Sequence, residues 1–220
     1  MYAVRGAMTV STAHGCWVLP PQRALWIPPG VPHTFSHRRP ISLRTVYVRR
    51  GTTRMPQWGR CTVMQVSALV RELILSCVTM PWDHEVDSRA GRVGEVLLDQ
   101  LTLLQQDSFF LPEPLDPRAL RAAQIARADS GNILQIKEIA REAGASDRTL
   151  DRLFVAEVGM GFGAWRRNLR LMVALERLAA GEPVGTVATA IGYGNPSSFV
   201  AVFKSVFGAT PAKYFASYEP

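Results

Sequence analysis

The sequence predicts an α+β protein, in which an antiparallel β-barrel or sandwich is followed by an all-α region. Three observations support this class. Short apolar runs broken by Gly and Pro give way to helical periodicity near Ser67. Three prolines then fall within six residues, at Pro112, Pro114 and Pro117, and mark a boundary. Beyond this boundary one helical pattern occurs twice, with the copies about 48 residues apart.

Composition and charge narrow the class of protein. The chain has 220 residues, of which 47% are hydrophobic, so it is long and apolar enough to form real cores. Its formal net charge of +7 suits a polyanionic partner, with a merely basic globular protein as the alternative. The three cysteines, Cys16, Cys61 and Cys77, lack CxxC spacing, which argues against a zinc motif or a disulfide framework. Apolar runs stay well short of the ~18 residues of a membrane span, so we expect a cytoplasmic protein with no membrane partner.

The first segment, residues 1–66, is expected to form strands. Its apolar runs are short and rich in β-branched and aromatic residues. Gly and Pro separate them at intervals of ~8–12 residues, as in an antiparallel sandwich or small barrel. The expected strand segments are MYAVRGAMTV, CWVLPP, ALWIPPGVPHTF, SLRTVYV and RCTVMQV.

The second segment, residues 67–116, is expected to contain two amphipathic helices, Ser67–Val78 and Arg92–Gln106. Apolar residues recur there at i, i+3, i+4 and i+7. We expect these connector helices to pack either against the barrel or against a second protomer, which would give a homodimer. The prolines then form a stiff, extended connection, and the third segment, residues 117–220, follows.

The third segment contains the repeat. Ala140-x-x-x-Gly144 recurs as Ala188-x-x-x-Gly192, so that in each copy a short helix is expected to end at a glycine able to adopt positive φ. A polar residue then caps a second helix, and two helices joined by such a turn describe a helix-turn-helix. Gln135 stands where Ser or Thr would be expected to cap the first copy, which leaves the start of that helix open. The other matching pairs are Phe154 with Phe203, Gly159 with Gly208, and Trp165 with Tyr214.

The expected organisation of the third segment is two helix-turn-helix units, at about 136–158 and 184–207, joined by a linker helix at about 161–180. A 20-residue linker helix would span ~30 Å, close to the ~34 Å between successive major-groove segments on one face of B-DNA. For a single unit, an ordinary helical hairpin in an all-α core is an equal alternative, which two units in tandem disfavour. The linker helix also carries arginines that are expected either to be solvated or ion-paired surface side chains or to lie near phosphates: Arg166, Arg167 and Arg170.

The segment from about Pro117 to Tyr218 resembles the DNA-binding domain of AraC-type (AraC/XylS) transcriptional regulators. The resemblance rests on IAREAGASDRTLDRLFVAEVGMGFGAWRRNLRL and, with higher specificity, on VATAIGYGNPSSFVAVFKSVFGATPAKYF. In the first segment, LPPQRALWIPPGVPH is similar to the cupin-type sensor domain of the same regulators. The resemblance implies a truncated cupin-like β-barrel or sandwich followed by an all-α DNA-binding domain with two helix-turn-helix units and a long linker helix.

The resemblance further implies that the second helix of each unit enters the major groove of double-stranded DNA. Arg148 and Arg152 would each offer a bidentate fork to guanine, and Asp151 would accept from cytosine or orient an arginine. The second unit presents only short side chains, which favours positioning and shape readout, with Lys204 near a phosphate. The implied DNA-contacting residues are Ser146, Arg148, Thr149, Asp151, Arg152, Asn195, Pro196, Ser197, Ser198, Ala201 and Lys204.

The first segment offers candidate ligand residues. His33 lies where a later metal ligand of a cupin would stand, but His14, His37 and His84 have no ligand spacing with it, so no metal is expected. The opening MYAVRG resembles the middle of a cupin barrel, so either the true start lies upstream or the sensor is truncated. The aromatic residues form either an apolar effector pocket or ordinary core. The candidate pocket residues are Trp17, Trp26, His33 and Phe35.

The sequence therefore predicts a sequence-specific DNA-binding transcriptional regulator that responds to a small-molecule effector. It is expected to act in the cytoplasm at the nucleoid, with RNA polymerase as a possible further partner and with no cofactor. No nucleophile–base pair or paired carboxylates emerge, and the Gly159–Gly163 stretch follows a helix rather than a strand, so enzymatic activity is not expected. The alternatives are a metal-dependent cupin enzyme with a helical appendix and a helical protein-interaction module.

Overall fold

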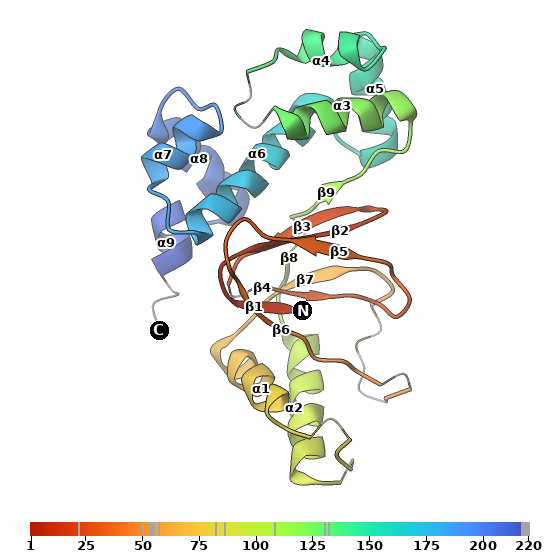
Figure 1. The fold of residues 1–220 in the computed structure, drawn as a ribbon, viewed down its shortest axis with the longest axis vertical. Helices are drawn as coiled ribbons and strands as arrows, with labels where there is room; N and C mark the ends of the chain where they lie inside the picture. Colours follow the sequence, from red (N-terminus) through yellow and green to blue (C-terminus); the bar gives the residue numbers. More distant parts are fainter. Residues whose placement is uncertain are drawn as a thin grey trace. The chain divides into compact units, whose positions relative to one another are not determined.

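The computed structural model describes residues 1–216 except 22, 50, 53–55, 57, 82, 86, 108, 130 and 132 (Figure 1). The chain divides into two compact units. The first contains Met1–Thr9 and Leu19–Phe109, and the second contains Val10–Val18 and Phe110–Pro220. A short N-terminal stretch therefore groups with the C-terminal helices, and the expected boundaries at residues 66 and 116 stay a prediction.

Short antiparallel strands form two sheets, which confirms the strand-rich first segment. The five-stranded sheet has the order β6-β1-β4-β7-β8, and the four-stranded sheet has the order β5-β2-β3-β9. Tyr2 pairs with Ala24, and Ala24 with Met64, so these side chains share one face of the five-stranded sheet. The strands are β1 Tyr2–Arg5, β2 Met8–Thr12, β3 Gly15–Leu19, β4 Arg23–Trp26, β5 Thr34–Ser36, β6 Ser42–Arg44, β7 Thr62–Gln65, β8 Gln106–Asp107 and β9 Leu111–Pro112.

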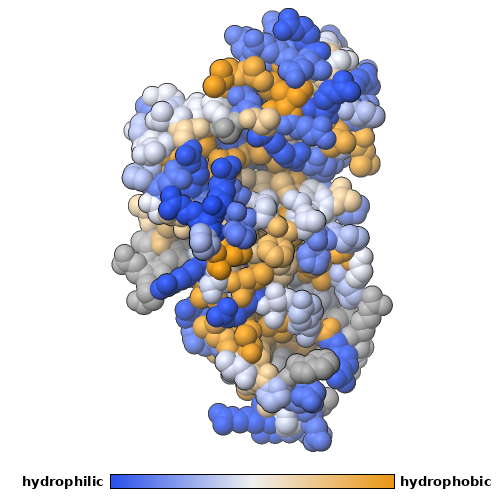
Figure 2. All heavy atoms as spheres, viewed as in Figure 1, coloured by the Kyte–Doolittle hydropathy of each residue, from blue (hydrophilic) through white to orange (hydrophobic). Residues whose placement is uncertain are grey.

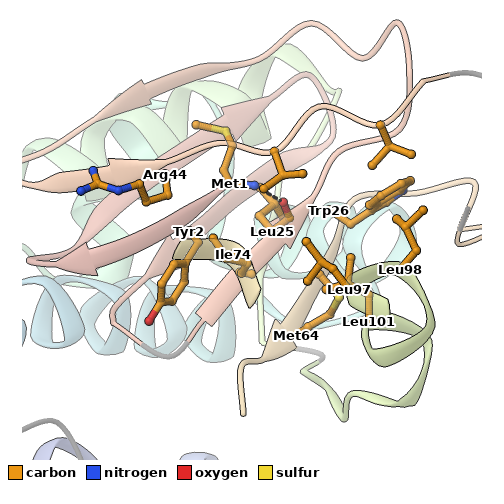
Figure 3. Close-up of a pocket in the computed structure, with 13 residues that line it drawn as sticks. Met1, Tyr2, Leu25, Trp26, Arg44, Met64, Ile74, Leu97, Leu98 and Leu101 are labelled. Carbon is orange, nitrogen blue, oxygen red and sulfur yellow. Dashed lines mark hydrogen bonds between the residues drawn. The ribbon is translucent and has the colours of Figure 1, made fainter. Parts of the chain in front are cut away.

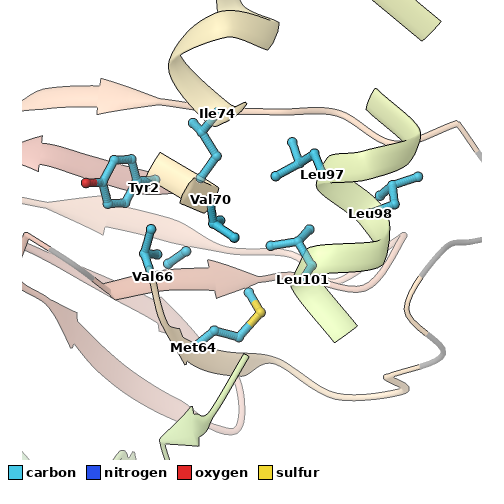
Figure 4. Packing of buried hydrophobic residues seen from close by; sticks show 9 residues of the cluster. Tyr2, Met64, Val66, Val70, Ile74, Leu97, Leu98 and Leu101 are labelled. Atoms are coloured by element: carbon cyan, nitrogen blue, oxygen red, sulfur yellow. The ribbon is translucent and has the colours of Figure 1, made fainter. Parts of the chain in front are cut away.

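Two helices cover that face of the five-stranded sheet. Helix α1, Ala68–Val78, begins where the Ser67 hydroxyl accepts from the Val70 N–H, and α2, Arg89–Leu103, is capped in the same way by Ser88. Figure 4 shows apolar side chains of the two helices converging over the sheet residues. The connector helices thus pack against the barrel segment, one of the two expected arrangements. The core residues of this cluster are Tyr2, Ala24, Met64, Val66, Val70, Ile74, Leu97, Leu98 and Leu101.

The second connector helix and the proline connection differ from the expectation. Helix α2 ends at Leu103 rather than at Gln106, because Leu104 is extended and Gln106 joins β8, which pairs with β7. The proline-rich connection likewise contains strand β9, which pairs with β3. Strands of two residues carry no periodicity of their own, and only their partners reveal them.

The C-terminal segment forms the predicted tandem units around one long helix. In Figure 1, helix α6 runs from the group containing α3, α4 and α5 to the group containing α7, α8 and α9. The glycines that end the two short helices, Gly144 and Gly192, both have φ of +78°, as the repeat predicts. The helices are α3 Pro117–Ala128, α4 Ile136–Glu142, α5 Asp147–Val158, α6 Phe162–Ala179, α7 Val184–Ala190, α8 Pro196–Phe207 and α9 Pro211–Ala216.

Equivalent aromatic contacts support the two copies of the repeat. The ring of Trp165 lies edge-on to Phe154 at 5.3 Å between centroids, and Tyr214 lies edge-on to Phe203 at 5.5 Å. Phe154, Phe203 and Trp165 are fully buried. The repeated residues therefore form the same packing contact in each half, and each contact orients one helix-turn-helix unit.

Strand β9 connects the β2–β3 hairpin to the helices within the second unit. Cys16 pairs with Leu111, and the Trp17 ring stacks on Phe110 at 5.8 Å. The indole N–H of Trp165 in α6 donates to the Pro112 carbonyl at 2.8 Å. This linker segment is thus held by hydrogen bonds, as a strand rather than as a free connection.

Candidate nucleic-acid interface

The second helices of the two units, α5 and α8, each bury one face and expose the other. Leu150 and Phe154 of α5, and Phe199 and Phe203 of α8, are fully buried. Figure 2 shows hydrophilic side chains over α4 and α5, together with smaller apolar patches. Each helix has an exposed face of polar and small side chains, which is the arrangement that a helix inserted in a groove requires.

The N-termini of both helices are closed by the polar residues that the sequence analysis singled out. Ser146 Oγ accepts from the Thr149 N–H at 3.1 Å, and the two hydroxyl groups are 2.8 Å apart. Asn195 Oδ1 accepts from the Ser198 N–H at 2.8 Å, with Pro196 at the first helical position. Ser146 and Asn195 therefore define where the two helices begin, since Ser146 Oγ and Asn195 Oδ1 accept from N–H groups of the first turn.

The exposed face of α5 carries two arginines. Arg148 and Arg152 are one turn apart, and within the described part of the chain neither has an ion-pair partner. Val155 follows on the same face with 52% of its surface exposed, and the sequence analysis missed it. Its position three residues after Arg152 was the available signal, because i and i+3 share a helix face.

The Asp151 carboxylate forms a hydrogen bond within the protein that the sequence analysis did not predict. Its Oδ1 accepts from the backbone N–H of Phe162 at 3.0 Å, at the first turn of α6. The N-cap residue of α6 is Gly161, which has no side chain with which to cap the helix. Asp151 therefore satisfies the start of the linker helix. The expectation that it accepts from a cytosine or orients an arginine stays a prediction.

The exposed face of α8 is made of short side chains and one lysine. Ser197, Ser198, Ala201 and Lys204 are all exposed. Pro196 is exposed at the start of the same helix. The structure thus places the predicted residues of the second unit on one presented helix, as it does Arg148 and Arg152 in the first.

The arginines of α6 turn inward rather than toward solvent, with the exception of Arg167, which is exposed. Arg166 forms an ion pair with Asp129 at 2.5 Å, but it is buried rather than on the surface as the ion-paired alternative of the sequence analysis had it. Arg170 Nε donates to the Ile191 carbonyl at 2.6 Å, and burial lowers the pKa of its guanidinium. Asp129 also accepts from the backbone N–H groups of the α3–α4 connection and was not singled out from the sequence.

The first unit contains an apolar cavity of about 50 Å³ between the five-stranded sheet and helices α1 and α2. Figure 3 shows Trp26 beside Leu97 and Leu98 of α2. The Trp26 indole nitrogen is buried and has no hydrogen-bond partner among the described residues. The lining residues are Met1, Tyr2, Ala24, Leu25, Trp26, Arg44, Val46, Val48, Met64, Ile74, Leu97, Leu98 and Leu101.

Of the four candidate pocket residues, only Trp26 lines this cavity. Trp17 is buried in the second unit against Phe110. Phe35 is 51% exposed on β5, and His33 is exposed with its Nδ1 3.0 Å from the Val31 carbonyl oxygen. These three residues therefore lie outside this cavity, Trp17 fits the alternative of ordinary core, and their role toward an effector stays a prediction.

Comparison with known proteins agrees with this architecture. A helix-turn-helix domain matches residues 139–217, and an AraC-like ligand binding domain matches residues 1–56. Over 214 residues the chain is 31% identical to the HTH-type transcriptional regulator NimR of Escherichia coli (strain K12), covering 97% of this chain and 78% of NimR. This chain belongs to the AraC family of transcriptional regulators.

Other AraC-family similarities are partial. The chain is 34% identical over 146 residues to the HTH-type transcriptional regulator RipA of Corynebacterium glutamicum, covering 58% of this chain and 44% of RipA. A solved AraC-type regulator from Chromobacterium violaceum is 25% identical, with a TM-score of 0.44 over 46% of this chain and 92% of that one. As an AraC-family member, this protein is a DNA-binding transcriptional regulator with an N-terminal ligand-binding domain.

No helix in the described ranges is both long enough and apolar enough to cross a membrane.

Proposed function

We propose that this regulator recognises a specific DNA sequence by placing α5 and α8, its recognition helices, in successive major grooves. The observation that carries the proposal is the pair of exposed helix faces joined by one long helix. Helix α6 has 18 residues, and at 1.5 Å per residue it spans about 27 Å. This length suits two helices that contact DNA about one turn, ~34 Å, apart.

The two recognition helices would contribute differently. Arg148 and Arg152 each present a guanidinium fork that matches O6 and N7 of guanine. Val155 offers an apolar surface of the kind that packs on a thymine methyl group. The α8 face of Ser197, Ser198 and Ala201 allows close approach but few forks, so it would favour shape readout. Lys204 would then contact a phosphate.

The test begins with selection of binding sites from a random duplex pool, followed by affinity measurements on the selected site. Arg148→Ala and Arg152→Ala should each cost about 1–3 kcal/mol and relax the preference at one base position. Lys204→Ala should weaken all duplexes alike and lower the salt slope by about one. Arg89→Ala, which removes an exposed arginine at the start of α2, is the matched control and should change neither property. Equal binding of selected and scrambled duplexes by the parent protein would refute sequence-specific recognition.

The effector would bind in the apolar cavity of the first unit. At about 50 Å³, this cavity is smaller than the ~150 Å³ that accommodates benzene in an engineered core. An effector of ordinary size would therefore have to move Leu97 and Leu101 of α2 away from the sheet. Its binding energy would thus act directly on a connector helix.

An apolar occupant of this cavity can be tested without knowing the natural effector. Benzene, which would enter only by moving α2 away from the sheet, should raise the melting temperature of the parent protein, and Ala24→Leu, which fills the cavity, should abolish that shift. Thr79→Ala, at the exposed end of α1, serves as the control. An identical benzene shift in the Ala24→Leu variant would place the binding elsewhere.

A second copy of this chain is a further proposed partner. Exposed apolar residues on both connector helices supply a surface for a second protomer, and Leu103→Glu should then shift the sedimentation of the chain toward monomer. The exposed apolar residues of this surface are Leu69, Val78, Val96 and Leu103.

As a regulator, this protein would act in the cytoplasm at the nucleoid and contact RNA polymerase at its promoters.

A further inference from the structure

The geometry points to Asp151 and Arg170 as positioning residues that hold the first recognition helix to the start of α6 and the second to its middle. Their combined effect would be to make the protein measure the spacing between its two DNA half-sites strictly. This inference rests on the proposed sequence-specific recognition by α5 and α8. It assigns to these two side chains a role in spacing selectivity rather than in contacts with DNA.

The first lock joins α5 to the start of α6. Asp151 lies on α5 between the two presented arginines, and its Oδ1 accepts from the Phe162 N–H at 3.0 Å. A Cβ atom added at Gly161 would overlap this carboxylate, so the glycine leaves the space that the aspartate fills. Because helix N–H groups in the first turn have no partners within the helix, α5 supplies an acceptor that α6 lacks. The rotation of α5 about its axis is thereby tied to α6.

The second lock joins α6 to the turn that precedes α8. Arg170 Nε donates to the Ile191 carbonyl at 2.6 Å, and its guanidinium lies 4.2 Å from the centroid of the Tyr193 ring. Ile191 and Tyr193 flank Gly192, the turn of the second unit. The Tyr193 ring in turn packs on Phe199 of α8 at 5.6 Å. One side chain therefore holds both the backbone of the turn and the aromatic ring that contacts the recognition helix.

The two locks lie eight residues apart along one helix, about 12 Å at 1.5 Å per residue. An inserted base pair would move one half-site by about 3.4 Å and rotate it by about 35° relative to the other. Recognition helices held at both the start and the middle of α6 cannot follow this displacement, whereas helices released at one of these points can tilt. Loss of either lock should therefore weaken spacing discrimination more than it weakens binding.

The experiment uses the full chain and a duplex selected from a random pool, with one base pair then inserted or deleted between the two half-sites. The parent protein should lose at least about tenfold in affinity for either altered duplex, the size of a lost base contact. Asp151→Ala and Arg170→Met should each lose less than about threefold. If both variants keep the parent's spacing penalty, the inference is overturned.

Two controls separate positioning from simple stability. In the double variant Asp151→Ala with Gly161→Ser, the serine caps α6 from within its own chain segment, so the melting temperature should recover while spacing discrimination stays weak. Recovery of discrimination in that variant would reduce Asp151 to an ordinary cap and overturn the inference. Asp151→Asn, whose amide oxygen can still accept from Phe162, should retain discrimination.

A third control concerns Arg170. If this arginine contacted a phosphate, Arg170→Met would lower the salt slope of binding by about one. The positioning role predicts an unchanged slope, so a lowered slope would overturn it. Selection of no sequence at all would refute the proposed function itself, and the inference with it. A selected sequence with unaltered spacing behaviour in the variants would refute the inference alone.

Discussion

The buried ion pair between Asp129 and Arg166 should be essential to the stability of the helical unit. The two side chains are 6% and 8% exposed, and Arg166 Nη2 lies 2.5 Å from Asp129 Oδ2. The same carboxylate accepts from the Ile133 and Leu134 N–H groups, at 2.9 and 3.1 Å. It therefore joins the end of α3, the α3–α4 connection and α6.

Arg166→Met removes the cation and keeps most of the apolar stem. Asp129 is then left buried with two backbone donors but without a counter-charge, and breaking such a pair costs about 3–5 kcal/mol. Exposed pairs contribute only about 0–1 kcal/mol, so burial decides the magnitude. The double variant Asp129→Asn/Arg166→Met leaves no unpaired charge and should recover part of the loss, with a coupling energy above about 1 kcal/mol.

Native-state hydrogen exchange of α3 and α6, followed by mass spectrometry, measures this effect within the unit concerned. Protected amides of these helices should exchange about 150- to 5,000-fold faster in Arg166→Met. Arg118→Met, which breaks the solvent-exposed pair with Asp116, is the matched control and should leave their exchange nearly unchanged. A change of less than about 1 kcal/mol in Arg166→Met would show that the buried pair contributes no more than a surface pair.

Three further predictions concern other contacts. Hydrogen bonds donated by Arg118 lower the pKa of the Asp116 carboxyl to about 2. The stability advantage of the parent over Asp116→Asn should therefore be full above about pH 4 and vanish as the pH falls toward 2. An advantage that grew on acidification would contradict this. Burial raises the pKa of the Cys16 thiol to about 11. At pH 8 this thiol should therefore react with iodoacetamide far more slowly in folded than in urea-unfolded protein, and equal rates would refute the burial. Trp165→Phe leaves the Pro112 carbonyl without its 2.8 Å donor and should lower the free energy of unfolding by about 1–3 kcal/mol, whereas an unchanged urea midpoint would argue against that bond.

The tandem helical units were predictable because their signals are local. Helix ends follow from the glycines at 144 and 192, and the inward stripes follow from the spacing of Leu150 with Phe154 and of Phe199 with Phe203. The predicted bounds of the two units, 136–158 and 184–207, and of the linker helix, 161–180, lie within one residue of the ends of α4 and α5, of α7 and α8, and of α6. Even Gln135 is accommodated locally, since its N–H donates to Glu138 Oε2 at 2.6 Å.

The candidate site was only partly predictable. The sequence placed Arg148, Arg152 and the short side chains of α8 on presented faces, and the structure has them exposed. It did not reveal that the Asp151 carboxylate accepts from the Phe162 N–H, because that hydrogen bond depends on how the α5–α6 turn closes. It also did not show that only Trp26 of the four candidate pocket residues lines the described cavity, since strand partners distant along the chain decide which face is covered.

By itself, the sequence determined the class of protein, its helical repeat and the helix faces available for DNA, because periodicity and capping act over a few residues. Only the tertiary structure decided which polar side chains are free and which are bound to the protein's own backbone. It also decided where strands β8 and β9 form, and that the cavity lies beside α2. The physical reason is the same in each case: hydrogen bonds and burial between distant segments depend on chain closure, which no local pattern encodes.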